Sequence, residues 1–157
     1  AAVQEKQLYD YASSSSAKVV FTTQGAIVGD DEFRSIRITV TRDQRKIEIL
    51  DGYTNEVKSS RAFSNNQAAF DTFLRALHNA GYMNTRDSKV TDERGVCPQG
   101  LRYIYELWDN DQQLHRGWST SCTNKDGTFN GSALVVRRLF EDQITDYNDI
   151  VSGVQLR

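Results

Sequence analysis

The side chains that could act as nucleophile or base in this chain do not form a known catalytic pattern. His115 and Ser119 share one predicted strand. A period of two puts both on one face, but about 13 Å apart, which is too far for a hydrogen-bonded dyad. No Gly-x-Ser-x-Gly turn precedes Ser119. The pair is therefore interpreted as part of a solvated strand surface.

Carboxylates gather in three groups that could carry acid–base work. They are Asp30-Asp31-Glu32, Asp92-Glu93, and Asp142 with Asp146 and Asp149. The first follows Gly29 in a predicted turn and is expected to be solvated. Asp109-Asn110-Asp111 resembles the start of a calcium loop but lacks its spacing and its distal Glu. We expect no metal and no cofactor and favour a non-enzymatic protein. An enzyme of unrecognised type stays open, with its cleft expected at the long polar loop 84–96.

Cys97 and Cys122 bracket a predicted β-hairpin. Leu101–Trp108 and Leu114–Ser121 alternate apolar and polar residues around a turn at Asp109, Asn110 and Asp111. Folding the arms about Asp109 and Asn110 brings the cysteines opposite each other, at the Cα separation of about 4.4–6.8 Å that a disulfide needs. A disulfide predicts an extracytoplasmic protein, either secreted or on the cell surface. Two free thiols in a cytosolic protein are the alternative.

Both faces of this hairpin carry large side chains. Tyr103 and Tyr105 lie on one face, whereas Ile104 and Trp108 lie on the other. One face must be core, and the other would expose residue types that are frequent in binding hot spots, unless a helix or the N-terminal segment covers it. The candidate partner-binding residues are Trp108, Asp109, Asn110, Asp111 and Trp118, together with Gly25, Asp30 and Asp31 of a Gly-containing loop.

The elements that would hold these residues follow from hydrophobic periodicity. Alternation predicts strands near 19–23, 33–41, 47–49 and 53–63. A helix is predicted at 65–80, because Phe70, Phe73, Leu74 and Leu77 share one face and Ser64 with Gln67 forms a capping-box pattern. After the hairpin, Ser132 would cap a second helix at 133–143, and 150–156 would be a strand or an extended tail. The predicted fold is α+β: an antiparallel meander plus a disulfide-linked hairpin, with two helices on one face of the sheet.

Two regions are predicted in the chain. Residues 1–17 contain the serine-rich run Ala12–Ala17 and are interpreted as a lead-in or tether, and 18–157 as a single domain. The chain has 157 residues and a net charge of −2. Because it has no basic stripe, a nucleic-acid partner is not expected. Apolar runs are too short to span a membrane. The start at Ala1-Ala2-Val3 fits removal of an upstream anchor or signal, or an ordinary cloning boundary.

The order of the segments resembles emfourin-like inhibitors of thermolysin-type metalloproteases. Those proteins begin with an extended Gly-containing strand, continue through a helix and a Tyr-containing strand paired with a second strand, and close with a helix. The matching pieces here are Val19–Gly25, Phe70–Leu77, Tyr103–Leu107 and Leu134–Phe140. The resemblance covers most of residues 18–145 and implies an inhibitor of a secreted protease. The cysteine pair and the N-terminal segment depart from it, and no inhibitory loop can be assigned.

The leading hypothesis is a non-enzymatic, extracytoplasmic domain that binds another macromolecule, most simply another protein. Binding would use the hairpin aromatics or the Gly-containing loop. An inhibitor of a secreted protease, an enzyme of unrecognised type and a structural subunit of a surface assembly are the alternatives.

Overall fold

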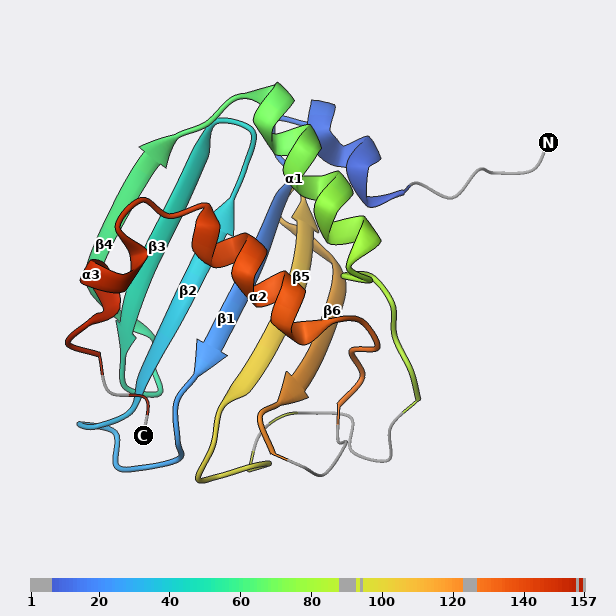
Figure 1. The fold of residues 1–157 in the computed structure, drawn as a ribbon. Coiled ribbons are helices and arrows are strands. Elements are labelled where there is room, and N and C mark those ends of the chain that lie inside the picture. Colours follow the sequence, from blue (N-terminus) through green and yellow to red (C-terminus); the bar gives the residue numbers. More distant parts are fainter. Residues whose placement is uncertain (1–6, 88–92, 94, 123–126, 155, 157) are drawn as a thin grey trace.

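The chain folds into one six-stranded antiparallel sheet with its helices on one face (Figure 1). This computed structural model describes residues 7–87, 93, 95–122, 127–154 and 156. The strand order is β4-β3-β2-β1-β5-β6. The strands are β1 (Lys18–Gln24), β2 (Arg34–Val40), β3 (Gln44–Asp51), β4 (Glu56–Ser64), β5 (Arg102–Asp109) and β6 (Gln112–Thr120). The α+β prediction is confirmed. The hairpin β5–β6 extends the meander because β5 pairs with β1.

Two amphipathic helices cover the sheet as predicted. Helix α1 (Gln67–Asn79) ends before Gly81, whose φ of +82° suits glycine. Its cap is Asn66, whose side chain accepts a hydrogen bond from the Ala69 amide, and not the predicted Ser64. Helix α2 (Ala133–Asp142) is capped by Ser132, whose hydroxyl accepts a hydrogen bond from the Val135 amide. A third helix, α3 (Tyr147–Val151), overlaps the first two residues of the tail 150–156 that was predicted as a strand or an extended segment.

The core lies between these helices and the inward face of the sheet. Aromatic rings meet at Phe140, which lies 5.2 Å from Phe21 of β1 and 5.1 Å from Phe73 of α1 between ring centres. Each of the three is at most 3% exposed. Side chains of this size contribute most to the hydrophobic stabilisation of a small domain.

The segment predicted to be a lead-in packs against the sheet domain. A 3₁₀ helix, η1 (Leu8–Ser13), lies beside α1, and Leu8 and Ala12 belong to the core. Beyond it, the hydroxyls of Ser14 and Ser16 bond Asp109 at 2.8 and 2.7 Å. Hydrogen bonds therefore join the serine-rich run to the tip of the β5–β6 hairpin. Residues 1–6 of the predicted tether lie outside the described part.

The disulfide is confirmed, although the predicted register was wrong. The turn consists of Asn110 and Asp111, both with positive φ, and Asp109 pairs with Gln112. The ladder therefore does not pair the cysteines. A separate turn, in which the Gly100 amide bonds the Cys97 carbonyl at 3.1 Å, brings Cys97 to 5.9 Å from Cys122 between Cα atoms. None of the described helices is long and apolar enough to cross a membrane.

Candidate functional site

The hairpin does not present the aromatic surface that the sequence suggested. Trp118 is only 1% exposed, so its prediction as an outward binding residue was wrong. It lies opposite Ile104, on the face turned away from the helices. On that side, Glu93 bonds Arg116 at 2.5 Å and the carbonyls of Val96 and Cys97 accept from Arg102. Glu93, Val96 and Cys97, which precede β5, therefore lie on the hairpin face that was expected to be exposed to solvent.

Most of the remaining hairpin candidates form hydrogen bonds within the molecule. Trp108 is half-buried and donates from its indole nitrogen to Glu106 at 2.8 Å. Asp109 and Asn110 accept hydrogen bonds from the serine-rich segment. Asp111 is exposed and makes no such contact with the described residues. The hairpin tip is therefore a junction between the N-terminal segment and β5–β6.

Gly25, predicted as part of a binding loop, is buried and acts in packing. A Cβ at this position would lie 2.7 Å from the Leu156 carbonyl oxygen and 2.9 Å from that of Arg34. Only glycine therefore lets the C-terminal segment approach, and the neighbouring Ala26 amide bonds the Leu156 carbonyl. Gly25 itself offers no surface to a partner, which corrects the prediction.

Asp30 and Asp31 of the same loop are exposed, and each has a defined place. The Asp30 carboxylate accepts the Tyr53 amide at 2.8 Å, and so links the loop to the β3–β4 turn. The Asp31 carbonyl accepts from the guanidinium of Arg34 at 3.1 Å. The loop is therefore held from two sides while its side chains face solvent.

Arg102 anchors the base of this loop, a role that its place in an alternating strand did not indicate. It is 2% exposed, and its guanidinium donates to the Gly25 carbonyl at 2.5 Å and to the Val96 and Cys97 carbonyls at 3.3 and 3.2 Å. Burial lowers the pKa of Arg102, although Tyr53 and Glu93 oppose this shift. A guanidinium can serve several carbonyls at once because its donors form a rigid fork.

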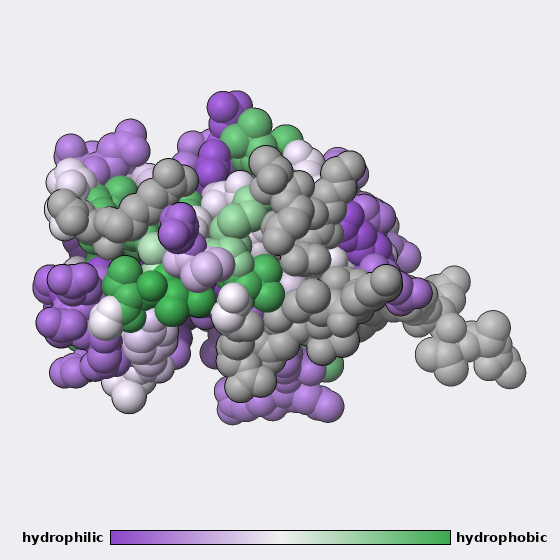
Figure 2. Space-filling view, turned by 90° about the horizontal axis from the view of Figure 1, so that it is seen from below, coloured by the Kyte–Doolittle hydropathy of each residue, from purple (hydrophilic) through white to green (hydrophobic). Residues whose placement is uncertain are grey.

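Hydrophobic residues are exposed around this anchored loop. The described part of the chain has seven large exposed ones, and four lie here: Ile27, Val28, Tyr53 and Val57. Tyr53 stacks on Phe33 with ring centres 4.1 Å apart and donates to the Val28 carbonyl at 2.7 Å. We name residues 26–33 and 52–57 the loop end. Figure 2 views the molecule from this end and shows hydrophobic residues across its middle, with hydrophilic residues around them.

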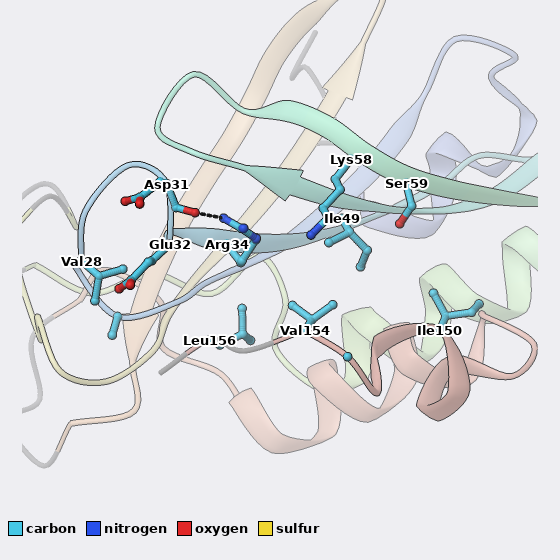
Figure 3. Close-up of a pocket in the computed structure, with 12 residues that line it drawn as sticks. Val28, Asp31, Glu32, Arg34, Ile49, Lys58, Ser59, Ile150, Val154 and Leu156 are labelled. Atoms are coloured by element: carbon cyan, nitrogen blue, oxygen red, sulfur yellow. Dashed lines mark hydrogen bonds between the residues drawn. The ribbon is translucent and has the colours of Figure 1, made fainter.

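A pocket of about 570 Å³ opens beside the loop end (Figure 3). Its walls come from the loop, from β2–β4 and from the C-terminal segment. Arg34 pairs with Asp51 within the sheet, whereas Lys58 has no ion-pair partner among the described residues. The lining residues are Ala26, Val28, Asp31, Glu32, Arg34, Ile49, Lys58, Ser59, Ile150, Gly153, Val154 and Leu156.

A β-bulge explains why two neighbouring residues of β4 line this pocket. Ile49 pairs with Ser59 and Leu50 pairs with Val57, so Lys58 is an extra residue between two ladder pairs. A bulge re-aims side chains that strict alternation would send to opposite faces. Figure 3 shows Lys58 and Ser59 on the pocket side. The pocket therefore brings the ammonium group of Lys58 and the carboxylates of Asp31 and Glu32 together with apolar side chains of the C-terminal segment.

Of the suspected catalytic groups, Asp31 and Glu32 line this pocket, and the others lie apart from it. Ser119 shares a hydrogen bond of 2.8 Å with the Tyr105 hydroxyl, and His115 lies against Tyr82. Asp142, Asp146 and Asp149 lie near the α2–α3 connection. Asp92 falls outside the described residues, and its neighbour Glu93 is paired with Arg116. Within the described ranges, no His, Cys, Asp and Glu side chains form a group of three suited to a metal ion.

His115 is expected to make the protein less stable in acid. Burial lowers the pKa of its imidazole below the ordinary 6.5, and a backbone hydrogen bond with Tyr82 opposes this only in part. The unfolded chain therefore binds the proton first, and the contribution of His115 to the free energy of unfolding is lost as the pH falls below about 6.5. Urea unfolding of the wild type and His115→Gln over this range measures the effect. Equal pH dependence in both proteins would contradict it.

Comparisons with known proteins add no family to these observations. No protein-family model matches the chain, and no curated protein is significantly similar to it. The geometry of the described residues therefore carries the functional argument.

Proposed function

We propose that this chain is a non-enzymatic domain that binds another protein through its loop end. The supporting observation is that Ile27, Val28, Tyr53 and Val57 are exposed on an ordered framework. Exposed apolar groups on a rigid loop bind with little loss of conformational entropy. This favours the Gly-containing loop over the hairpin aromatics of the original hypothesis.

An extracytoplasmic location is part of the proposal. It rests on the disulfide between Cys97 and Cys122, since such bonds persist mainly in oxidising compartments. The same location would suit an inhibitor of a secreted protease. The loop 27–32 is exposed, and hydrogen bonds hold the chain before it at Gly25 and within it at Asp30. Inhibition is therefore the second candidate and a special case of binding.

Replacing Ile27 and Val28 with aspartate is expected to abolish capture of the partner. The domain, with its disulfide intact, is used as bait for extracellular and membrane fractions of its source. The matched control replaces Leu134 and Val135 of α2, two adjacent residues that are 48% and 46% exposed against 39% and 37% for the loop pair. Replacing methyl groups that are buried in an interface with charges weakens binding by more than about tenfold.

The control variant should capture the partner as the wild type does. Loss of capture in both variants, or in neither, would contradict a binding site at the loop end. If the partner is a protease and its activity falls on adding the wild-type domain alone, the binding function is inhibition.

A further inference from the structure

The two edges of the sheet differ in how they are protected. On β6, Trp118 bonds residues outside the ladder: its amide donates to the Thr128 hydroxyl at 3.3 Å and its carbonyl accepts from Phe129 at 3.1 Å. On β4, no hydrogen bond of the described residues reaches the main chain of 56–63 from outside the β3–β4 ladder. Eight of its nine residues are exposed. This open edge is about 30 Å long.

The two faces of this edge strand have different chemistry. On the helix-covered face, β4 presents Ser59, Arg61 and Phe63, because these pair with Ile49, Ile47 and Arg45. The bulge adds Lys58 to that face. The opposite face presents Val57, Ser60 and Ala62, which pair with Leu50, Glu48 and Lys46. One face is therefore cationic, and the other is small or apolar.

The cations of β4 are available to a partner. Within the described part of the chain, Lys58 and Arg61 form no ion pair, although Arg37 and Lys46 on β2 and β3 both contact Glu48. The guanidinium of Arg61 lies 5.5 Å from the ring centre of Phe63. Unpaired cations along a sheet edge repel cationic strands and attract acidic ones, so they select a partner by charge.

We infer that the partner adds a strand to β4, through an extended segment in which carboxylates alternate with apolar residues. Its carboxylates would face Lys58 and Arg61, and its apolar side chains would face Val57 and Ala62. Main-chain hydrogen bonds would supply affinity, and the alternating side chains would supply specificity. This inference rests on the proposed function, since Val57 belongs to the loop end and Lys58 lines the adjacent pocket.

A fluorescein-labelled peptide of alternating valine and glutamate, as long as β4, tests this by fluorescence anisotropy. We expect a Kd tighter than about 1 mM for the wild type. Arg61→Glu should weaken binding about tenfold or more, and a peptide with lysine in place of glutamate should not bind. Arg138→Glu, an exposed arginine on α2, is the control and should bind like the wild type.

Methylation of the peptide nitrogens tests the main-chain pairing without altering the protein. In an added strand, the amides of alternate residues face β4 and the others face solvent. Methylating one set should abolish binding, and methylating the other should leave it. Equal binding of both methylated peptides, no effect of Arg61→Glu, or no binding of the glutamate peptide would overturn the inference. Because the Ile27 and Val28 variant is tested separately, failure here leaves the loop-end proposal standing. A dimer formed through β4 would also overturn the inference, because a second copy would then occupy the edge.

Discussion

Arg102→Met is expected to lower the free energy of unfolding by about 4 kcal/mol, the largest effect of any single substitution considered. The guanidinium is 2% exposed and serves the carbonyls of Gly25, Val96 and Cys97. Methionine fills a similar volume but donates no hydrogen bond. The Gly25 and Val96 carbonyls would therefore lose this donor, and the Cys97 carbonyl would keep only the Gly100 amide. Each buried group left unsatisfied costs about 1–3 kcal/mol. Urea unfolding measures the loss.

The same substitution should also loosen the loop end. The Ile27 amide donates to the Pro98 carbonyl at 2.7 Å, directly beside the carbonyls that Arg102 holds. Its hydrogen exchange should accelerate in Arg102→Met more than that of amides in α1. Arg102→Lys keeps the charge but lacks the fork of donors, so it should give an intermediate loss of stability. A loss below about 1 kcal/mol for Arg102→Met would contradict the anchoring role.

Removing the disulfide is expected to lower the free energy of unfolding by about 3 kcal/mol. Cys97 and Cys122 are separated by 25 residues, and closing a loop of this length restricts the unfolded chain. The sheet should persist, because the β5–β6 and β1–β5 ladders do not depend on the bond. Urea unfolding of the variant with both cysteines replaced by serine, with circular dichroism as the readout of the sheet, measures both effects.

The bond between Cys97 and Cys122 should also affect the loop end, because Arg102 binds the Cys97 carbonyl as well as that of Gly25. Faster hydrogen exchange at Ile27 is therefore expected in the double serine variant. Unchanged stability, or loss of the whole sheet, would contradict the account of the disulfide as a local link.

The sequence predicted those parts of the fold that depend on short-range pattern. Phe70, Phe73, Leu74 and Leu77 repeat with helical period and are all buried in α1. The alternating strands were found for the same reason. The register of the β5–β6 hairpin was harder to predict from the sequence. A turn of Asp109, Asn110 and Asp111 can be centred on different pairs of residues, and the φ values decide which pair forms the turn.

The candidate site was predicted only in part, since it depends on contacts between distant segments. Asp30 and Asp31 belong to an exposed loop as expected, but Gly25 is buried by Leu156. Trp118 followed the alternation of an exposed strand and is nevertheless buried. Arg102 is a charged residue in an alternating strand, so its sequence position suggests a side chain that faces solvent. The three carbonyls that it binds come close to it only in the folded chain. No local pattern encodes such long-range burial.

The affinity of the captured partner for two matched variants tests the central claim most directly. One variant carries aspartate at Ile27 and Val28, and the other carries aspartate at Leu134 and Val135. A binding site at the loop end predicts a Kd raised by at least about tenfold for the first and unchanged for the second. A Kd unchanged for the first variant, or raised equally for both, would contradict it.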